Sequence, residues 1–169
     1  FNLLGPLANP ALAQRQLLGV YDPRMTGVMA GALLELGTEC ALVIHCGGLD
    51  EIGLHEVTRG HLVKNGGVES FALDPAELGL APAPIEALKG GDPKKNAEIL
   101  SAVLQGEPGP RGDVVAVNAA AALVVAGLVK DLPEGLERAR EVLRKGQAAR
   151  VLERYAESSQ RVKSNGEPA

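Results

Sequence analysis

QLLGVYDPRMTGVMAGALLELGTECALVIH, residues 16–45, assigns this chain to a fold class. Residues 16–21 form a short apolar run that predicts a buried strand. Asp22 and Pro23 follow as a helix N-cap and a proline at the first helical position. Residues 40–45 form a second apolar run, typical of a parallel strand covered on both faces. Strand, helix and strand within about thirty residues make a βαβ unit, so we expect an α/β fold.

The predicted helix between these strands has one apolar face and a defined end. Gly37 is expected to end the helix in the left-handed conformation that glycine adopts easily. The apolar residues recur at helical spacing, and we expect them to be buried together. They are Met25, Val28, Met29, Ala32, Leu33 and Leu36.

The rest of the chain adds a hairpin and then helices. Asn65-Gly66-Gly67 is a strong turn signal between strands expected at residues 60–64 and 68–73. Beyond Asp92-Pro93, a second N-cap and proline pair, the pattern is helical. Helices are expected at about 92–104, 114–127, 133–145 and 148–155, with one helical turn at 85–89. The predicted fold is therefore α/β, with a central mostly parallel sheet flanked by helices, a β-hairpin and a helical C-terminal region.

Composition limits the functional classes. The 169 residues are 46% hydrophobic and 22% charged, with a net charge of -4, which suits one globular domain. An acidic chain is a poor candidate for broad binding to nucleic acid or to anionic membranes. The apolar run 114–129 is interrupted by Asn118 and Gly127, so we expect a buried helix and no membrane span. Cys40 and Cys46 do not form a C-x-x-C pair, which indicates buried, reduced thiols and a cytoplasmic location.

Asp50 and Glu51 are the main candidate site. They follow a Gly-Gly pair after the strand at 40–45, and ligands of open α/β sheets bind beyond the carboxyl ends of strands. Adjacent carboxylates can share a Mg²⁺ ion together with substrate phosphate. A solvated acidic loop is the other interpretation, and the residues alone favour it.

Other motifs have simpler structural interpretations. Residues 1–10, FNLLGPLANP, predict a short helix and a proline-rich turn, although such a rigid loop could also hold a flat ligand. Residues 88–97, LKGGDPKKNA, lack the spacing of known phosphate loops and are expected to be structural. Asn118 is expected to serve helix packing. The three histidines lack metal-ligand spacing, and His45, at a strand end, is expected to be structural.

Taken together, the motifs resemble the anthranilate phosphoribosyltransferase family. That family carries F-N-x-L-G-P-L-x-N-P, then L-V-x-H-G-x-x-G-L-D-E, L-x-G-G-D-x-x-x-N-A and V-x-x-N-A-A, in this order. The matching stretches here are FNLLGPLANP (1–10), LLGV (17–20), LVIHCGGLDE (42–51), LKGGDPKKNA (88–97), VAVNAAAAL (115–123) and LRKGQAARVLERY (143–155).

The resemblance implies a reaction and a set of site residues. Anthranilate would attack C1 of phosphoribosyl pyrophosphate and release pyrophosphate, a step of tryptophan biosynthesis. Gly5 and Pro6 correspond to the family's anthranilate site, and Asp50 and Glu51 to its Mg²⁺ ligands. The family is homodimeric, so a homodimer with these small-molecule substrates is expected, without nucleic acid or membrane.

The resemblance also implies a domain division and an incomplete site. Residues 1–14 correspond to a remnant of the family's small helical domain, residues 15–160 to the C-terminal part of its α/β domain, and 161–169 to a polar tail. The family's glycine-rich phosphate loop lies upstream of these motifs, so we expect the small domain to be largely missing and the chain alone to be inactive. Cys46 replaces a usual glycine.

Two related activities remain as alternatives. A pyrimidine nucleoside phosphorylase-like enzyme of the same fold would bind phosphate where this family binds pyrophosphate. A non-enzymatic relative would bind nucleic acid through a basic groove.

Overall fold

A computed structural model describes residues 3–165 of the chain, and the side chains of residues 3–161. Its elements in chain order are α1 (Leu4–Leu7), β1 (Arg15–Gly19), α2 (Met25–Glu35), β2 (Cys40–His45), β3 (Thr58–Lys64), β4 (Gly67–Leu73), the 3₁₀ turns η1 (Pro75–Leu78) and η2 (Ile85–Leu88), α3 (Pro93–Leu104), α4 (Pro110–Val125), α5 (Leu132–Arg144) and α6 (Gln147–Asn165).

The four described strands form one mixed sheet in the order β1-β2-β3-β4. β1 pairs with β2 in parallel, with Leu17 opposite Leu42. β2–β3 and β3–β4 are antiparallel. The α/β class and the hairpin are confirmed, but the expectation of a mostly parallel sheet is wrong for the described strands. The physical reason is the connection after β2, a loop without a crossover helix, which returns the chain antiparallel beside the same strand.

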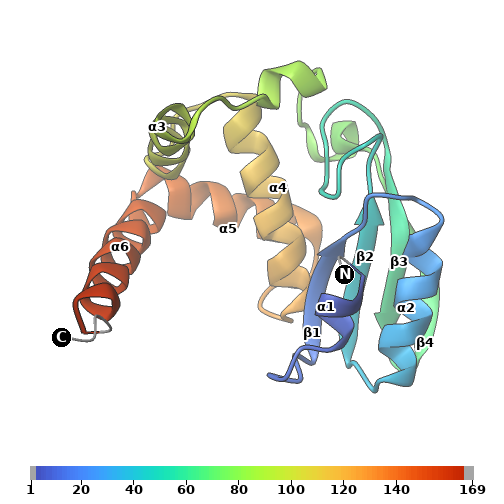
Figure 1. Cartoon of the computed structure of the whole chain (residues 1–169). Helices are drawn as coiled ribbons and strands as arrows, with labels where there is room; N and C mark the ends of the chain where they lie inside the picture. Colours follow the sequence, from blue (N-terminus) through green and yellow to red (C-terminus); the bar gives the residue numbers. More distant parts are fainter. Residues whose placement is uncertain (1–2, 166–169) are drawn as a thin grey trace.

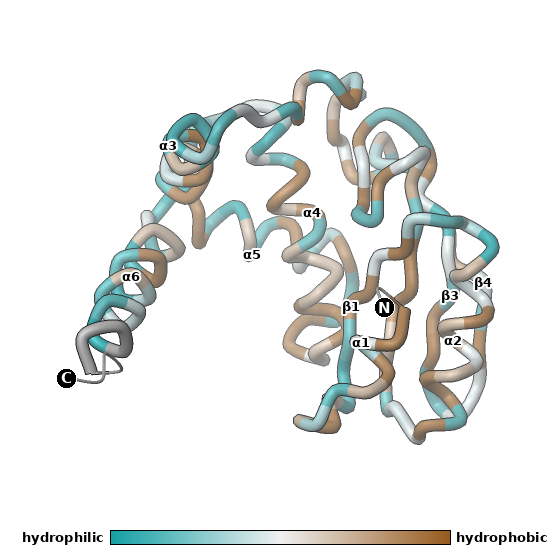
Figure 2. The backbone as a smooth tube through the Cα atoms, viewed as in Figure 1, coloured by the Kyte–Doolittle hydropathy of each residue, from teal (hydrophilic) through white to brown (hydrophobic). Residues whose placement is uncertain are grey.

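Helices cover both faces of this sheet. Along β2, Cys40, Leu42 and Ile44 point into the core shared with α4 and α5, whereas Ala41 and Val43 point into the core shared with α2. Figure 1 shows α2 in front of the strands and α4 on the other side. Because both faces are buried, the strand is apolar throughout, as the sequence indicates. Figure 2 shows the hydrophobic positions concentrated along the strands and α4.

The βαβ unit forms as expected, with one difference at the start of its helix. Helix α2 begins at Met25, because the Asp22 carboxylate accepts hydrogen bonds from the Arg24 backbone and guanidinium and holds a turn before the helix. Gly37 ends the helix at φ 79°, and the bonds from Gly37 to Leu34 and from Thr38 to Leu33 form a Schellman motif.

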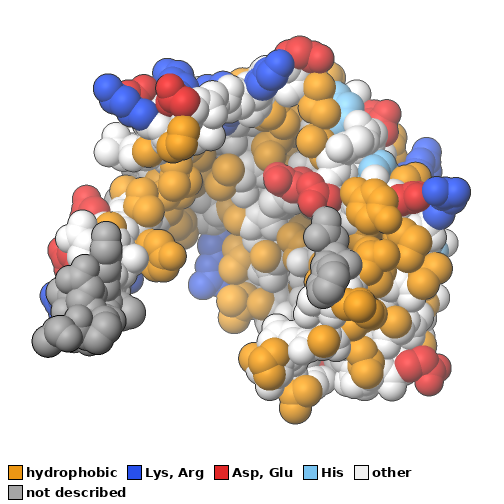
Figure 3. Space-filling view, viewed as in Figure 1, with side chains coloured by type: hydrophobic (Ala, Val, Ile, Leu, Met, Phe, Trp, Pro, Cys, Tyr) orange, Lys and Arg blue, Asp and Glu red, His pale blue; other side chains and the backbone are white. Residues whose placement is uncertain are grey.

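The predicted buried face of α2 is only partly correct. Met29 and Leu33 are buried, but Val28 and Leu36 are about 60% exposed. Thr26 and Ala30 are buried in their place. Figure 3 shows hydrophobic side chains gathered on the surface over α1 and α2.

The hairpin turn and the helical region match the sequence patterns. Asn65 and Gly66 both have positive φ, 53° and 72°, as a two-residue type I′ turn requires. Asp92 caps α3 by accepting a 2.8 Å hydrogen bond from the Lys95 backbone. Helix α4 begins at Pro110, four residues before the expected start, and Val115 remains exposed.

The helices at the C-terminal end extend away from the sheet. In Figure 1, α3 and α6 lie on the side of α4 and α5 that is remote from the strands. Helix α6 runs to Asn165, within the predicted polar tail 161–169, of which residues 166–169 lie outside the described part. None of the described helices combines the length and apolar character that crossing a bilayer requires.

Candidate functional site

A tight turn after β2 sets the position of the acidic pair. The backbone of Cys46 and that of Leu49 exchange two hydrogen bonds, of 2.9 and 2.7 Å. Gly47 and Gly48 lie between them with φ of 42° and 90°, values that residues other than glycine rarely adopt. The two glycines therefore reverse the chain within two residues and direct the following carboxylates back toward β1.

His45 stabilises this turn through both ring nitrogens. Nδ1 lies 2.8 Å from the Val20 carbonyl oxygen, and the Gly48 N–H lies 3.3 Å from Nε2. A carbonyl oxygen only accepts, so Nδ1 carries the hydrogen and Nε2 accepts from Gly48. This arrangement confirms a structural role for His45.

The loop then crosses the end of β1 in direct backbone contact. A Cβ atom on Gly19 would overlap the carbonyl oxygen of Asp50. Only glycine fits at this position while the loop keeps its course. The site is therefore at the carboxyl ends of β1 and β2, as the sequence indicates.

Asn118 in α4 holds the loop from the other side. Its Oδ1 accepts a 2.9 Å hydrogen bond from the Ile52 N–H, and its Nδ2 donates a 2.9 Å bond to the Ile52 carbonyl. The same Nδ2 donates to the carbonyl of Val114. The expectation that Asn118 serves helix packing was incomplete, because its amide binds both backbone groups of a residue beside the acidic pair. The requirement that a buried asparagine find partners was the signal in the sequence.

Asp50 and Glu51 are exposed at this fixed position. Within residues 3–161, neither carboxylate has a hydrogen-bond or ion-pair partner, whereas the backbone on both sides is held. Two carboxylates without partners offer the oxygen ligands that a hard cation such as Mg²⁺ prefers.

Gly5 and Pro6 lie before β1 in the described structure. Both belong to α1, the short helix that this stretch predicts. Pro6 lines a small cavity of about 80 Å³ that also contacts Gln16 and Thr38. Asp50 and Glu51 are not among the residues that line this cavity. Phe1 and Asn2 lie outside the described residues.

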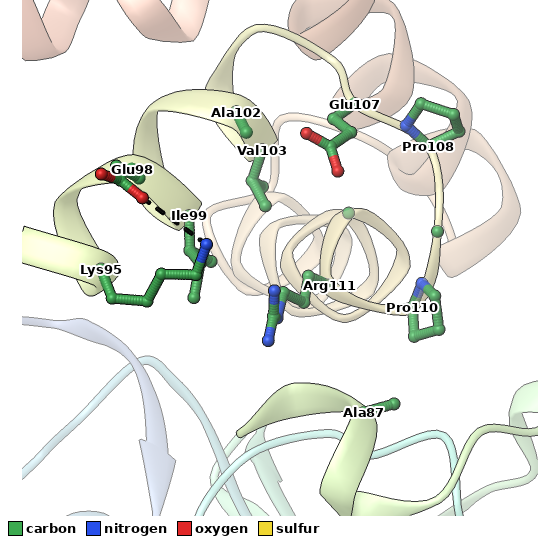
Figure 4. Close-up of a pocket in the computed structure, with 12 residues that line it drawn as sticks. Ala87, Lys95, Glu98, Ile99, Ala102, Val103, Glu107, Pro108, Pro110 and Arg111 are labelled. Carbon is green, nitrogen blue, oxygen red and sulfur yellow. Dashed lines mark ion pairs between the residues drawn. The ribbon is translucent and has the colours of Figure 1, made fainter. Parts of the chain in front are cut away.

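The LKGGD stretch is structural, as expected. The Asn96 side chain accepts a 2.8 Å bond from the Gly91 N–H and donates a 3.0 Å bond to the Gly91 carbonyl. The neighbouring cavity, about 430 Å³, lies between η2, α3 and the start of α4. Figure 4 shows that Lys95 and Arg111 share it with Glu98 and Glu107. Balanced charges there do not favour an anion.

Asp22 is the titratable group at this edge of the sheet whose pKa is most clearly displaced. The hydrogen bond from the Arg24 side chain, followed by that from the Arg24 backbone, lowers the pKa of Asp22 from 3.8 to about 2. The carboxylate therefore keeps its charge in mild acid and continues to hold the turn before α2.

The sequence patterns did not predict one further group of side chains. The structure brings together Cys46, His55 and Glu56, at the two ends of the loop that carries the acidic pair. Their sequence spacing matches no common metal-binding pattern, so only the path of the loop reveals the group. The expectation that both cysteines are buried free thiols is confirmed.

Comparison with known proteins finds relatives of one kind. The sequence pattern of the family described as "Glycosyl transferase family, a/b domain" matches residues 1–149. An anthranilate phosphoribosyltransferase of Symbiobacterium thermophilum is 48% identical over 165 residues, which cover 97% of this chain and 48% of that protein. The chain thus spans about half the length of the curated relatives it matches.

The chain is also similar to solved structures of anthranilate phosphoribosyltransferases. The anthranilate phosphoribosyltransferase of Thermus thermophilus superposes with a TM-score of 0.82 at 47% identity, covering 90% of this chain and 45% of that one. The Saccharomyces cerevisiae enzyme in complex with PRPP and Mg has a TM-score of 0.77 at 28% identity, covering 89% of this chain and 44% of the other.

Proposed function

Since this chain belongs to the glycosyl transferase family with an a/b domain, we propose that it forms the C-terminal part of an anthranilate phosphoribosyltransferase. The reaction transfers the phosphoribosyl group from phosphoribosyl pyrophosphate to anthranilate and releases pyrophosphate. The identity of 45–48% with two enzymes of this name supports the proposal. The same reaction follows from the resemblance of the ordered sequence motifs.

The observation that carries this proposal is the acidic pair on its restrained loop. We propose that Asp50 and Glu51 hold Mg²⁺, which would neutralise the charge that develops on the departing pyrophosphate. The side chains are exposed and without partners in the described part of the chain, while Ile52 beside them is fixed by Asn118. Binding a cation would therefore require little ordering of the backbone, and restrained ligands lose less entropy on binding.

The second predicted pair would help to orient a substrate. We propose that Gly5 and Pro6 line the anthranilate site, on the strength of the matching motif. An arylamine is nucleophilic without a strong base, so orientation of the two substrates can supply much of the rate.

Assembly and location belong to the same proposal. The family resemblance supports a homodimer, which light scattering of the purified protein would test. The two buried free thiols suit a reducing compartment, and we propose the cytoplasm.

The decisive experiment is a chimaera. This chain would replace the matching 165 residues of the Symbiobacterium thermophilum relative. With phosphoribosyl pyrophosphate and Mg²⁺, the folded chimaera should consume anthranilate. The loss of anthranilate fluorescence measures this consumption. The 169-residue chain alone should show no turnover, because it matches only about half of each relative.

Matched variants test the acidic pair within the chimaera. Asp50→Asn with Glu51→Gln should slow turnover on the order of 100-fold, comparable to the loss of one group that stabilises developing negative charge. It should also raise the Mg²⁺ concentration required. Glu69→Gln, which removes an exposed carboxylate on β4, is the control and should leave both quantities unchanged. A folded chimaera that cleaves nucleosides with phosphate and ignores anthranilate would support the phosphorylase alternative.

A further inference from the structure

The loop between β2 and β3 brings three metal-ligating side chains together at its base. Cys46 follows β2 directly, and His55 and Glu56 precede β3. One ligand atom from each lies within 4.8 Å of the other two. Asp50 and Glu51 are on the same loop, between the two ends that this group joins.

His55 has the hydrogen-bonding state of a metal ligand. Its Nε2 lies 3.2 Å from the carbonyl oxygen of Gly47. Because that oxygen only accepts, Nε2 carries the hydrogen, and Nδ1 has a bare lone pair. Nδ1 is buried and has no hydrogen-bond partner among the described residues. In metal sites, the second ring nitrogen of a ligating histidine usually donates to a carbonyl or carboxylate in this way.

Two glycines leave space for the three ligands. A Cβ atom on Gly53 would lie 2.7 Å from Cys46 Sγ and 2.8 Å from His55 Nδ1. The thiol and the bare nitrogen therefore border the same side of the Gly53 backbone. A Cβ atom on Gly47 would overlap the Glu56 carboxylate, which is solvent-exposed and has no ion-pair partner among the described side chains. The same Gly47 position lies 2.6 Å from His55 Nε2, so the two glycines leave room for the three side chains around the His55 ring.

We propose that Cys46, His55 and Glu56 bind a divalent transition-metal ion with the ligand preference of Zn²⁺. Thiolate, imidazole and carboxylate are the three protein ligands that zinc takes, and a water molecule would complete a tetrahedral set. Mg²⁺ prefers oxygen ligands, so this site and the Asp50–Glu51 pair select different ions. The proposal stands independently of the proposed function.

Binding changes the protonation of one group. The Cys46 thiol now donates a 3.5 Å hydrogen bond to the Glu56 carbonyl oxygen. On coordination, its sulfur–hydrogen bond breaks, the proton leaves to solvent, and the thiolate electron pair forms the bond to the metal. The ion then joins both ends of the loop and restrains the acidic pair between them.

Cobalt(II) is a suitable spectroscopic probe for this site. The purified chain, freed of metal with a chelator and kept reduced with a phosphine, is titrated with Co²⁺. A thiolate-to-cobalt charge-transfer band in the near ultraviolet is expected for the wild type, and Zn²⁺ should abolish it by displacement. Absence of the band from the folded wild type would overturn the proposal.

Variants identify the ligands. Cys46→Ala should lack the band, whereas Cys40→Ala, which removes the other buried thiol, should keep it. His55→Asn should weaken Co²⁺ binding about tenfold or more. Circular dichroism confirms that each variant is folded. A band that survives Cys46→Ala, or unchanged affinity in His55→Asn, which alters a partly exposed side chain and is expected to fold, would show that these residues are not the ligands.

Discussion

Asn118→Ala removes the side chain that fixes the loop of the acidic pair. Ile52 is fully buried, and both of its backbone polar groups are bound by the Asn118 amide at 2.9 Å. Without that amide, a buried N–H and a buried carbonyl lose their partner, at about 1–2 kcal/mol each. Alanine restores up to about 0.7 kcal/mol through its higher helix propensity. The expected net loss is therefore about 1.3–3.3 kcal/mol in the free energy of unfolding.

Asn96→Ala is the matched control for this prediction. Asn96 makes the same two-bond contact with the backbone of Gly91, also from a helix, but both residues are exposed. Water can replace the amide there, so the change should be within about 0.5 kcal/mol. The gain in helix propensity applies to both variants and cancels in the comparison.

Urea unfolding followed by circular dichroism measures both variants, and a shifted midpoint at unchanged slope reports stability. Hydrogen exchange adds a local readout, since the Ile52 amide should lose protection in Asn118→Ala while amides of β2 keep theirs. If Asn118→Ala and Asn96→Ala cost the same, the argument from burial is wrong.

Two further predictions concern the same edge of the sheet. Gly19→Ala should destabilise the protein by about 1–3 kcal/mol, because its Cβ would overlap the Asp50 carbonyl. Gly31→Ala on α2 meets no neighbouring atom and should stabilise the protein by about 0.5–1 kcal/mol. Thermal unfolding that ranks the two variants in the opposite order would contradict this. The folded-state pKa of Asp22 is lowered from 3.8 to about 2 by Arg24, so its contribution is complete above about pH 4 and is lost as the pH falls through 2. The stability difference between wild type and Asp22→Asn should accordingly shrink between pH 4 and 2, and a difference that grows over this range would show the wrong sign.

Local signals in the sequence were sufficient for most of the fold. The apolar run at β2 predicted its bounds correctly, and the Asn65-Gly66 turn fixed the hairpin register. Each depends on periodicity or on the conformational demands of a few neighbouring residues. The mixed sheet was missed because strand direction depends on the whole connection between strands. The start of α2 was misplaced since Asp22 engages Arg24 instead of capping the helix.

The candidate site was predictable only in part, because its supports come from distant segments. The position of Asp50 and Glu51 after β2 followed from the sequence. The contact between Asn118 and Ile52 spans 66 residues, and no local pattern encodes it. The Cys46 group likewise depends on the loop closing on itself. Family resemblance does not reveal it either, because Cys46 stands where the family usually has glycine.

The way this loop is held supports our proposal that it is a binding element. Ile52 and Leu54 are buried in the core just after the carboxylates, and the Gly47-Gly48 turn fixes the chain just before them. All of these restraints act on backbone or apolar groups, so none of them uses the carboxylates. A turn that only connects two strands needs no such precision, whereas a pair of charges meant for a cation gains affinity when the chain is ordered in advance. A metal ion at the base of the same loop would add one more restraint of this kind, again without using Asp50 or Glu51.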